Sequence, residues 1–171
     1  DIMWKAGKEE GKPCFYFIVG GNFPLHHREP SFKEQVAQTY GNIAAGCTGL
    51  SYFYGIPATP GNWKAYLQLN REVLSLNDVL LSEEDVAQAA STADPKKLRS
   101  ITRRHAGHVY VVACNLDEKA IGDITFTLPA GLKYGREAQV LFEERTLAIK
   151  DGRFTDSFPG HTRHVYKVKI D

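Results

Sequence analysis

Residues 28–55 read REPSFKEQVAQTYGNIAAGCTGLSYFYG, and this stretch decides the fold class of the first half of the chain. Ser31, followed three residues later by Glu34, predicts a capping box at the start of a helix. Apolar residues then recur every three or four positions up to Cys47, which predicts one buried helix face. Residues 50–54 form a short apolar and aromatic run between two glycines, which is typical of a buried strand. A helix that leads into a buried strand is half of a βαβ unit, so we expect a parallel sheet covered by helices.

The neighbouring segments extend this strand–helix pattern in both directions. Residues 14–19 are an unbroken apolar run, CFYFIV, and predict a second buried strand. Residues 61–81 carry apolar side chains at helical spacing and predict one long helix, with Pro60 suited to its first turn. The order strand, helix, strand, helix leads us to interpret residues 1–85 as a β/α portion.

The period of the apolar pattern changes in the second half. Residues 86–97 are small, polar and weakly patterned, and we interpret them as a linker between two domains. From residue 98 onward, six or seven short alternating runs are separated by glycine and proline. The run HVYVVACN at residues 108–115 is the strongest of these, and Asp151-Gly152 predicts a hairpin turn. We therefore expect residues 98–171 to form an antiparallel β-sandwich, so that the fold class is α/β plus all-β.

The composition gives no support to several classes of protein. A net charge of +1 offers no electrostatic reason to expect nucleic acid as a partner. Residues 1–85 carry 7 basic and 10 acidic side chains and residues 86–171 carry 14 and 10, an asymmetry that could help two halves or two chains dock. No run approaches the roughly 18 apolar residues of a membrane span. We expect Cys14, Cys47 and Cys114 to be buried free thiols, with a Cys14–Cys47 disulfide as the alternative.

Several phrases of the sequence, taken as a series, resemble a known family. They are CFYFIVGG, AAGCTGLSYFYG, YVVACNLDEKAIGDITFTLP, VLFEERTLAIKDGRFTDSF and the terminal HVYKVKI. The series resembles the C-terminal end of the (β/α)8 barrel of glycoside hydrolases, from the clan that includes β-galactosidases, followed by their small β-sandwich. The resemblance covers nearly the whole chain from residue 13. It implies that the chain holds the last two strand–helix units of a barrel and an appended sandwich.

The resemblance implies a glycoside hydrolase-like function that this chain does not perform alone. Retaining enzymes of this kind need two carboxylates about 5 Å apart. The family's acid/base follows the fourth strand, which is missing here, and its nucleophile position at the end of the seventh strand reads Val19-Gly20-Gly21-Asn22. We therefore expect carbohydrate activity only together with the rest of the barrel, and whether the protein is an enzyme stays open. The alternatives are a non-catalytic structural or assembly protein that reuses the scaffold, and a carbohydrate-binding module.

Candidate site residues follow from the rule that active sites form at the carboxyl ends of barrel strands. On that rule the expected substrate-binding residues are Asn22, His26, His27, Arg28, Tyr52 and Tyr54, with Phe23 beside them on the rim. Glu29 is the only acid in the first loop and is a weak catalytic candidate. A carboxylate beside a helix start is more often a dipole or salt-bridge partner. The alternative for the two tyrosines is that they fill the barrel interior, and for Arg28 that it pairs with an acid.

We expect no metal and no cofactor. Adjacent residues such as His26-His27 point in opposite directions on a strand and have no third ligand at metal spacing. Four further histidines are scattered over the predicted strand ends: His105, His108, His161 and His164. The expected partners are the remaining barrel polypeptide and a glycan, with a homo-oligomer as an open alternative. The opening DIMW does not look like a natural start, so we expect a cleaved or partial chain, and the family resemblance slightly favours an extracellular location.

Overall fold

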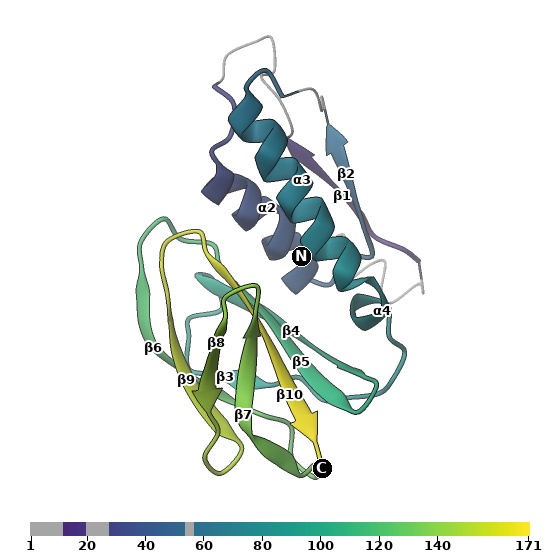
Figure 1. Ribbon diagram of the computed structural model, residues 1–171, viewed down its shortest axis with the longest axis vertical. Helices are drawn as coiled ribbons and strands as arrows, with labels where there is room; N and C mark the ends of the chain where they lie inside the picture. The colour runs from purple at the N-terminus through teal and green to yellow at the C-terminus, as the bar shows by residue number, and fades with distance from the viewer. Residues whose placement is uncertain (1–11, 20–27, 54–56) are drawn as a thin grey trace.

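The structure is a computed structural model that describes residues 12–19, 28–53 and 57–171. Figure 1 shows helices and a pair of parallel strands at one end, and antiparallel sheets at the other. The chain is mixed α/β, with more strand than helix elements in the described part. This part of the predicted fold class is confirmed.

The first part of the chain is a two-stranded parallel sheet with helices on one face. In chain order its elements are β1 (Phe15–Val19), α2 (Phe32–Ala44), β2 (Gly49–Phe53), α3 (Pro60–Ser75) and α4 (Asn77–Leu80). The predicted parallel pairing is confirmed and runs from Phe15 opposite Gly49 to Val19 opposite Phe53. The single helix expected over residues 61–81 is instead two helices, because Leu76 leaves the helical region with φ −98° and ψ 1°.

Local sequence determines where α2 and α3 begin. The predicted capping box of α2 is confirmed, because Ser31 Oγ accepts from the Glu34 N–H at 3.3 Å and Glu34 Oε2 accepts from the Ser31 N–H at 2.7 Å. At α3, Thr59 Oγ1 accepts from the Asn62 N–H at 3.4 Å, and Pro60 occupies the first turn as predicted. Both helix starts therefore follow from residues within four positions of the cap.

The rest of the chain forms two antiparallel sheets around one core. The five-stranded sheet has the order β4-β5-β10-β7-β8, and the three-stranded sheet has the order β3-β6-β9. The strands are β3 (Ala90–Ser91), β4 (Leu98–His105), β5 (His108–Asn115), β6 (Ile121–Thr127), β7 (Tyr134–Leu141), β8 (Arg145–Ala148), β9 (Arg153–Phe158) and β10 (Arg163–Ile170). Phe126, Phe154 and Tyr166 pack ring to ring in the core between the sheets. Strand β3 lies within residues 86–97 and pairs with β6.

The strand β10 is buried on both faces. The sequence predicts that His164, Tyr166 and Val168 face the core, and all three are buried. Val165, on the opposite face, is also fully buried. It belongs to a second apolar cluster under the helices, formed with Val36, Tyr40, Ile43, Leu69, Leu76, Ile101, Val112 and Cys114. The second cluster packs α2 and α3 onto the five-stranded sheet, which joins the two ends of the molecule in Figure 1.

Gly160 lies where its loop passes close to the backbone of Glu118, and this gives a first prediction. A Cβ atom at Gly160 would stand 1.8 Å from the carbonyl oxygen of Glu118, so Gly160→Ala must push two backbones apart. We expect this change to lower the free energy of unfolding by about 1–3 kcal/mol in chemical denaturation. Gly122→Ala is the matched control, because no atom lies within 4 Å of its added methyl. Equal stability of the two variants would contradict this account of the loop contact.

Candidate functional site

Two of the six expected substrate-binding residues fall in the described part of the chain. Asn22, His26, His27 and Tyr54 lie outside the described residues. Arg28 pairs with Glu34 through Nη2 to Oε1 at 2.6 Å and Nη1 to Oε2 at 2.7 Å. The Tyr52 hydroxyl donates to Asn70 Oδ1 at 2.8 Å, and its ring meets the ring of Tyr66 edge to face. Arg28 and Tyr52 thus have separate partners, one at the start of α2 and the other on α3, and their role in binding sugar stays a prediction.

Glu29 connects the loop before α2 to the start of α3. Its carboxylate accepts from the Ala58 N–H, from the Thr59 hydroxyl at 2.8 Å and from Asn62 Nδ2 at 2.6 Å. The hydrogen bond from the Ala58 backbone is the main reason that the pKa of Glu29 is lowered. A carboxylate in this position also complements the positive end of the helix dipole. The geometry gives Glu29 a role in fixing two loops at the carboxyl ends of β1 and β2, while its catalytic role stays a prediction.

This contact can be tested by substitution of Glu29. Glu29→Gln keeps the shape of the side chain but removes the charge, so the hydrogen bonds that hold the start of α3 become weaker. We expect faster amide exchange at Ala58 and Asn62 and unchanged exchange in the antiparallel sheets, measured by NMR. Glu83→Gln, at an exposed position outside the helices, is the control. Unchanged protection at Ala58 would show that the carboxylate does not anchor this loop.

The face of the parallel sheet opposite the helices is open among the described residues. Phe15, Phe17, Val19 and Phe53 are 62%, 65%, 45% and 49% exposed, whereas Ile18 on the helix-covered face is 1% exposed. The rings of Phe17 and Phe53 meet edge to face at 5.9 Å between centroids. The expectation that β1 is a fully buried strand is therefore wrong for one face, because no described segment covers it. Exposed apolar side chains gathered on one face of a sheet are typical of an interaction surface.

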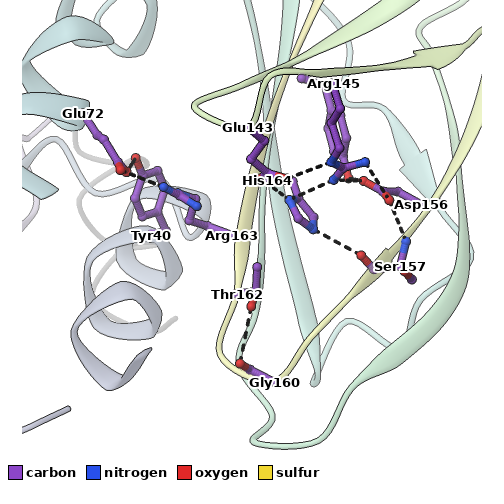
Figure 2. Close-up of polar contacts among 11 residues, drawn as sticks. Tyr40, Glu72, Glu143, Arg145, Asp156, Ser157, Gly160, Thr162, Arg163 and His164 are labelled. Carbon is purple, nitrogen blue, oxygen red and sulfur yellow. Dashed lines mark hydrogen bonds and ion pairs between the residues drawn. The ribbon is translucent and has the colours of Figure 1, made fainter. Parts of the chain in front are cut away.

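A buried ion pair joins the helices to the five-stranded sheet. Arg163 Nη2 donates to Glu72 Oε1 at 2.7 Å and Nε donates to Oε2 at 3.2 Å, while the Tyr40 hydroxyl donates to Oε2 at 2.8 Å (Figure 2). The side chains of Arg163 and Glu72 are 12% and 7% exposed. Burial, followed by the charge of Glu72, raises the pKa of Tyr40. Sequence reasoning missed this group, because Glu72 and Arg163 are 91 positions apart. One lies in a segment with helical spacing of apolar residues and the other in a segment with strand-like alternation.

A second charged cluster links the two antiparallel sheets. Arg145 of β8 donates to both carboxylate oxygens of Asp156 in β9, at 3.1 and 2.7 Å, and to Glu143 at 2.8 Å. Glu143 also contacts His164 Nδ1 (Figure 2). The Tyr166 hydroxyl donates to Asp156 at 2.9 Å. Burial alone would raise the pKa of Glu143 and of Asp156, but the hydrogen bonds outweigh it and lower both. Because these groups satisfy one another, we interpret the cluster as a structural link.

This cluster predicts an acid-dependent loss of stability. Carboxyl groups with a lowered folded pKa stabilise the fold above their unfolded pKa of about 4, and this contribution is lost as the pH falls through the folded pKa. Arg145→Met removes the main donors, so we expect a loss of about 2–3 kcal/mol at neutral pH and a flatter acid dependence. Denaturant titrations between about pH 3 and pH 7 measure both effects. Arg153→Met, at an exposed position, is the control, and a parallel acid dependence in wild type and Arg145→Met would contradict the assignment.

The described residues contain no cluster of metal-binding side chains, and their cysteines are free thiols. Residues 12–19, 28–53 and 57–171 contain no group of three or more His, Cys, Asp or Glu side chains placed to hold a metal ion. The three cysteines are free thiols, as predicted, but Cys47 is only half-buried whereas Cys14 and Cys114 are buried. Burial and the neighbouring Cys14 raise the pKa of Cys47 to about 11, which makes it a weak nucleophile at neutral pH. No helix in the same residues has the length and apolar content to cross a membrane.

A large cleft lies at the opposite end of the parallel strands from the expected site. It encloses about 790 Å³ between the end of α2 and β4 and is lined by Cys14 and Thr48 together with four cationic side chains: Lys12, Lys96, Arg99 and Arg103. Cys14 precedes β1 and Thr48 precedes β2, so the cleft adjoins the amino ends of the strands. Barrel enzymes place their chemistry at the carboxyl ends. The cleft is therefore separate from the site that the sequence predicts.

Comparison with known proteins gives a match at the level of fold. No protein-family model and no curated protein sequence matches this chain. Solved structures do match. The chain folds like part of a glycoside hydrolase. A maltogenic α-amylase from Thermotoga neapolitana matches over 99% of this chain and 45% of its own, with a TM-score of 0.65 and 11% identity.

Other glycoside hydrolases show the same partial match. The α-amylase of Geobacillus thermoleovorans matches over 97% of this chain and 42% of its own, with a TM-score of 0.64 and 11% identity. A putative α-galactosidase from Bacteroides fragilis matches over 91% of this chain and 33% of its own, with a TM-score of 0.60 and 13% identity. This chain therefore spans less than half the length of each enzyme. The expected resemblance to glycoside hydrolases is confirmed, and at these identities the likeness concerns the fold alone.

Proposed function

We propose that this chain is the C-terminal portion of a glycoside hydrolase-like protein, and that it is carbohydrate-active only together with the rest of the barrel. In this proposal residues 1–85 supply the last two strand–helix units of a (β/α)8 barrel. Residues 98–171 are an appended β-sandwich, and residues 86–97 join the two. The partial coverage of the matching glycoside hydrolases supports this arrangement, as does the shared core between the two antiparallel sheets.

The open face of the parallel sheet is the observation that carries the proposal. Parallel sheets occur almost only with both faces covered. In a closed barrel the face of β1 and β2 that bears Phe15, Phe17, Val19 and Phe53 would point inward, where layers of side chains from all strands fill the interior. The other strands of the barrel would therefore bury this patch. The matching enzymes possess more than twice the length of this chain, which is enough polypeptide to supply those strands.

In this proposal the chain contributes part of the rim of the active site and not its catalytic pair. Arg28 and Glu29 lie in the loop that follows β1, and Glu29 ties this loop to the one that follows β2. A rim of this kind would hold the glycan, for which Asn22, His26, His27, Arg28 and Tyr54 are the proposed contacts. Tyr52, the sixth expected residue, points toward α3, where its hydroxyl donates to Asn70, and so lies on the face away from the proposed barrel interior. The retaining mechanism needs two carboxylates. No carboxylate occurs in the sequence from Val19 to Asn22, so both would come from other parts of the barrel.

Glycosidase assays on the intact parent protein and on the 171-residue chain test this proposal. A panel of chromogenic α- and β-glycosides should be hydrolysed by the parent and not by the chain alone. In the parent, a Glu→Gln change at the acid that follows the fourth strand should abolish hydrolysis. Hydrolysis by the isolated chain would contradict the proposal. A folded parent that hydrolyses none of the panel would favour the non-catalytic alternative, which the lack of a carboxylate from Val19 to Asn22 also favours.

A further inference from the structure

Phe142 is an exposed aromatic side chain in an unfavourable backbone conformation. It lies in the turn between β7 and β8, is 44% exposed and has a φ of 69°. A positive φ favours glycine, and in a bulky residue it is an outlier. Residues held in such conformations cluster at binding sites, where the surrounding structure keeps them in place. Phe142 is therefore a candidate binding residue.

The surrounding structure fixes this turn and the ring. Glu143, the next residue, accepts from Arg145 Nε at 2.8 Å as part of the charged cluster between the sheets (Figure 2). The guanidinium of Arg163 lies over the ring of Phe142, 5.8 Å from its centroid. Arg163 is itself paired with the buried Glu72. A ligand that meets this ring would not have to order it first, which favours binding.

An open pocket lies between Phe142 and one side of α3. It encloses about 550 Å³, a size typical of sites for small ligands. Its remaining lining residues all belong to α3 and, apart from Leu67, are polar or charged: Lys64, Gln68, Arg71, Glu72 and Ser75. Neither Arg28 nor Glu29 is among them, so the pocket is separate from the rim at the carboxyl ends of β1 and β2. We name it the Phe142 pocket.

The charges of the Phe142 pocket favour an anionic ligand. Its carboxylate, Glu72, already pairs with Arg163. Lys64 and Arg71 are both exposed, and neither forms an ion pair with another residue of the described part of the chain. They are seven positions apart and so lie on the same side of α3. Arginine donates two parallel hydrogen bonds to a carboxylate, and lysine adds a mobile charge.

We propose that the Phe142 pocket binds an acidic saccharide. A sugar ring would stack its C–H face on Phe142, and its carboxylate would accept hydrogen bonds from Arg71 and Lys64. A uronic acid carries both groups on one residue, which matches an aromatic ring and two cations that line one pocket. An acidic peptide would supply the charge without the flat apolar face. The site goes beyond the proposed function, which places a glycan at the loops after β1 and β2.

Isothermal titration calorimetry on the intact parent protein tests the inference, with trigalacturonate as the ligand. We expect Phe142→Gly and Arg71→Gln each to raise the Kd at least tenfold, and Phe142→Tyr to retain binding. Glycine suits the positive φ of this turn, so Phe142→Gly removes the ring without straining the backbone. Phe32→Ala and Lys33→Gln remove an exposed ring and an exposed cation outside the pocket, and should leave the Kd unchanged.

Two further ligands separate the proposed chemistry from its competitors. Galactotriose has the sugar rings without the carboxylates, and triglutamate has the carboxylates without the rings. Binding of either one as tightly as trigalacturonate would overturn the assignment to an acidic saccharide. A wild-type protein that does not bind trigalacturonate, or an unchanged Kd in Phe142→Gly or in Arg71→Gln, would also overturn it. Arg71 is exposed, so its variant decides the matter if Phe142→Gly does not fold.

The same measurements keep this inference apart from the proposed function. A parent that hydrolyses no glycoside, but binds trigalacturonate through Phe142 and Arg71, would contradict the proposed function and support this inference. A parent that hydrolyses glycosides, but whose Kd for trigalacturonate is the same in wild type and Phe142→Gly, would overturn this inference alone.

Discussion

Replacement of Arg163 by methionine is expected to lower the free energy of unfolding by about 3–5 kcal/mol. The substitution leaves Glu72 as a buried carboxylate, with Tyr40 and Gln68 as its only remaining side-chain donors in the described structure. An uncompensated charge in the apolar cluster under the helices costs far more than the pair contributes when intact. Chemical denaturation monitored by circular dichroism measures the change.

Two further variants separate a buried ion pair from simple loss of packing. The triple variant Tyr40→Phe, Glu72→Leu, Arg163→Met removes every charged member of the group, and we expect it to recover most of the lost stability. Lys169→Met removes an exposed ion pair with Asp171, whose side chains are 71% and 54% exposed, and should change stability by less than about 1 kcal/mol. A triple variant that is as unstable as the single Arg163 variant would contradict the assignment of the loss to an unpaired charge.

Replacement of Phe17 by alanine should destabilise the intact parent far more than the isolated chain. In the isolated chain the ring is 65% exposed, so we expect a change of less than about 1 kcal/mol. In the parent the same ring would lie in the barrel interior, and its loss should cost about 3–5 kcal/mol. Denaturation of both proteins, wild type and variant, gives the two differences.

The control for this comparison is a core position that is buried without the missing polypeptide. Phe126 is fully buried between the antiparallel sheets, so Phe126→Ala should destabilise the chain and the parent by similar amounts. If Phe17→Ala lowered the free energy of unfolding of the parent as little as that of the isolated chain, the open face of the parallel sheet would not be a barrel interior.

Features that depend on neighbouring residues could be predicted from the sequence. The capping box of Ser31 and Glu34 was predictable because both partners lie within one helix turn. Strand β5 was predictable because a short continuous run of apolar, largely β-branched residues is typical of a buried strand, and β10 because apolar and polar residues alternate along part of it. The break at Leu76 was not predictable, because leucine favours helix and the apolar spacing continues across it.

Features that depend on tertiary contacts could not be predicted in the same way. Val165 is buried because α2 and α3 pack on the outer face of β10, and alternation indicates only one covered face. The contacts of Glu29 with Ala58 and Asn62 required the relative position of two loops, so the sequence offered only the general tendency of acids to lie beside helix starts. The exposure of β1 on one face depends on what is absent from the described structure, which an apolar run does not reveal.

The intact mass of the native protein, under denaturing and non-denaturing conditions, tests the central claim most directly. The account predicts that residues 1–171 occur within a longer polypeptide, or in a stable complex with one, of more than twice the length of this chain, as in the matching glycoside hydrolases. A native protein that is a stable monomer of 171 residues would contradict it.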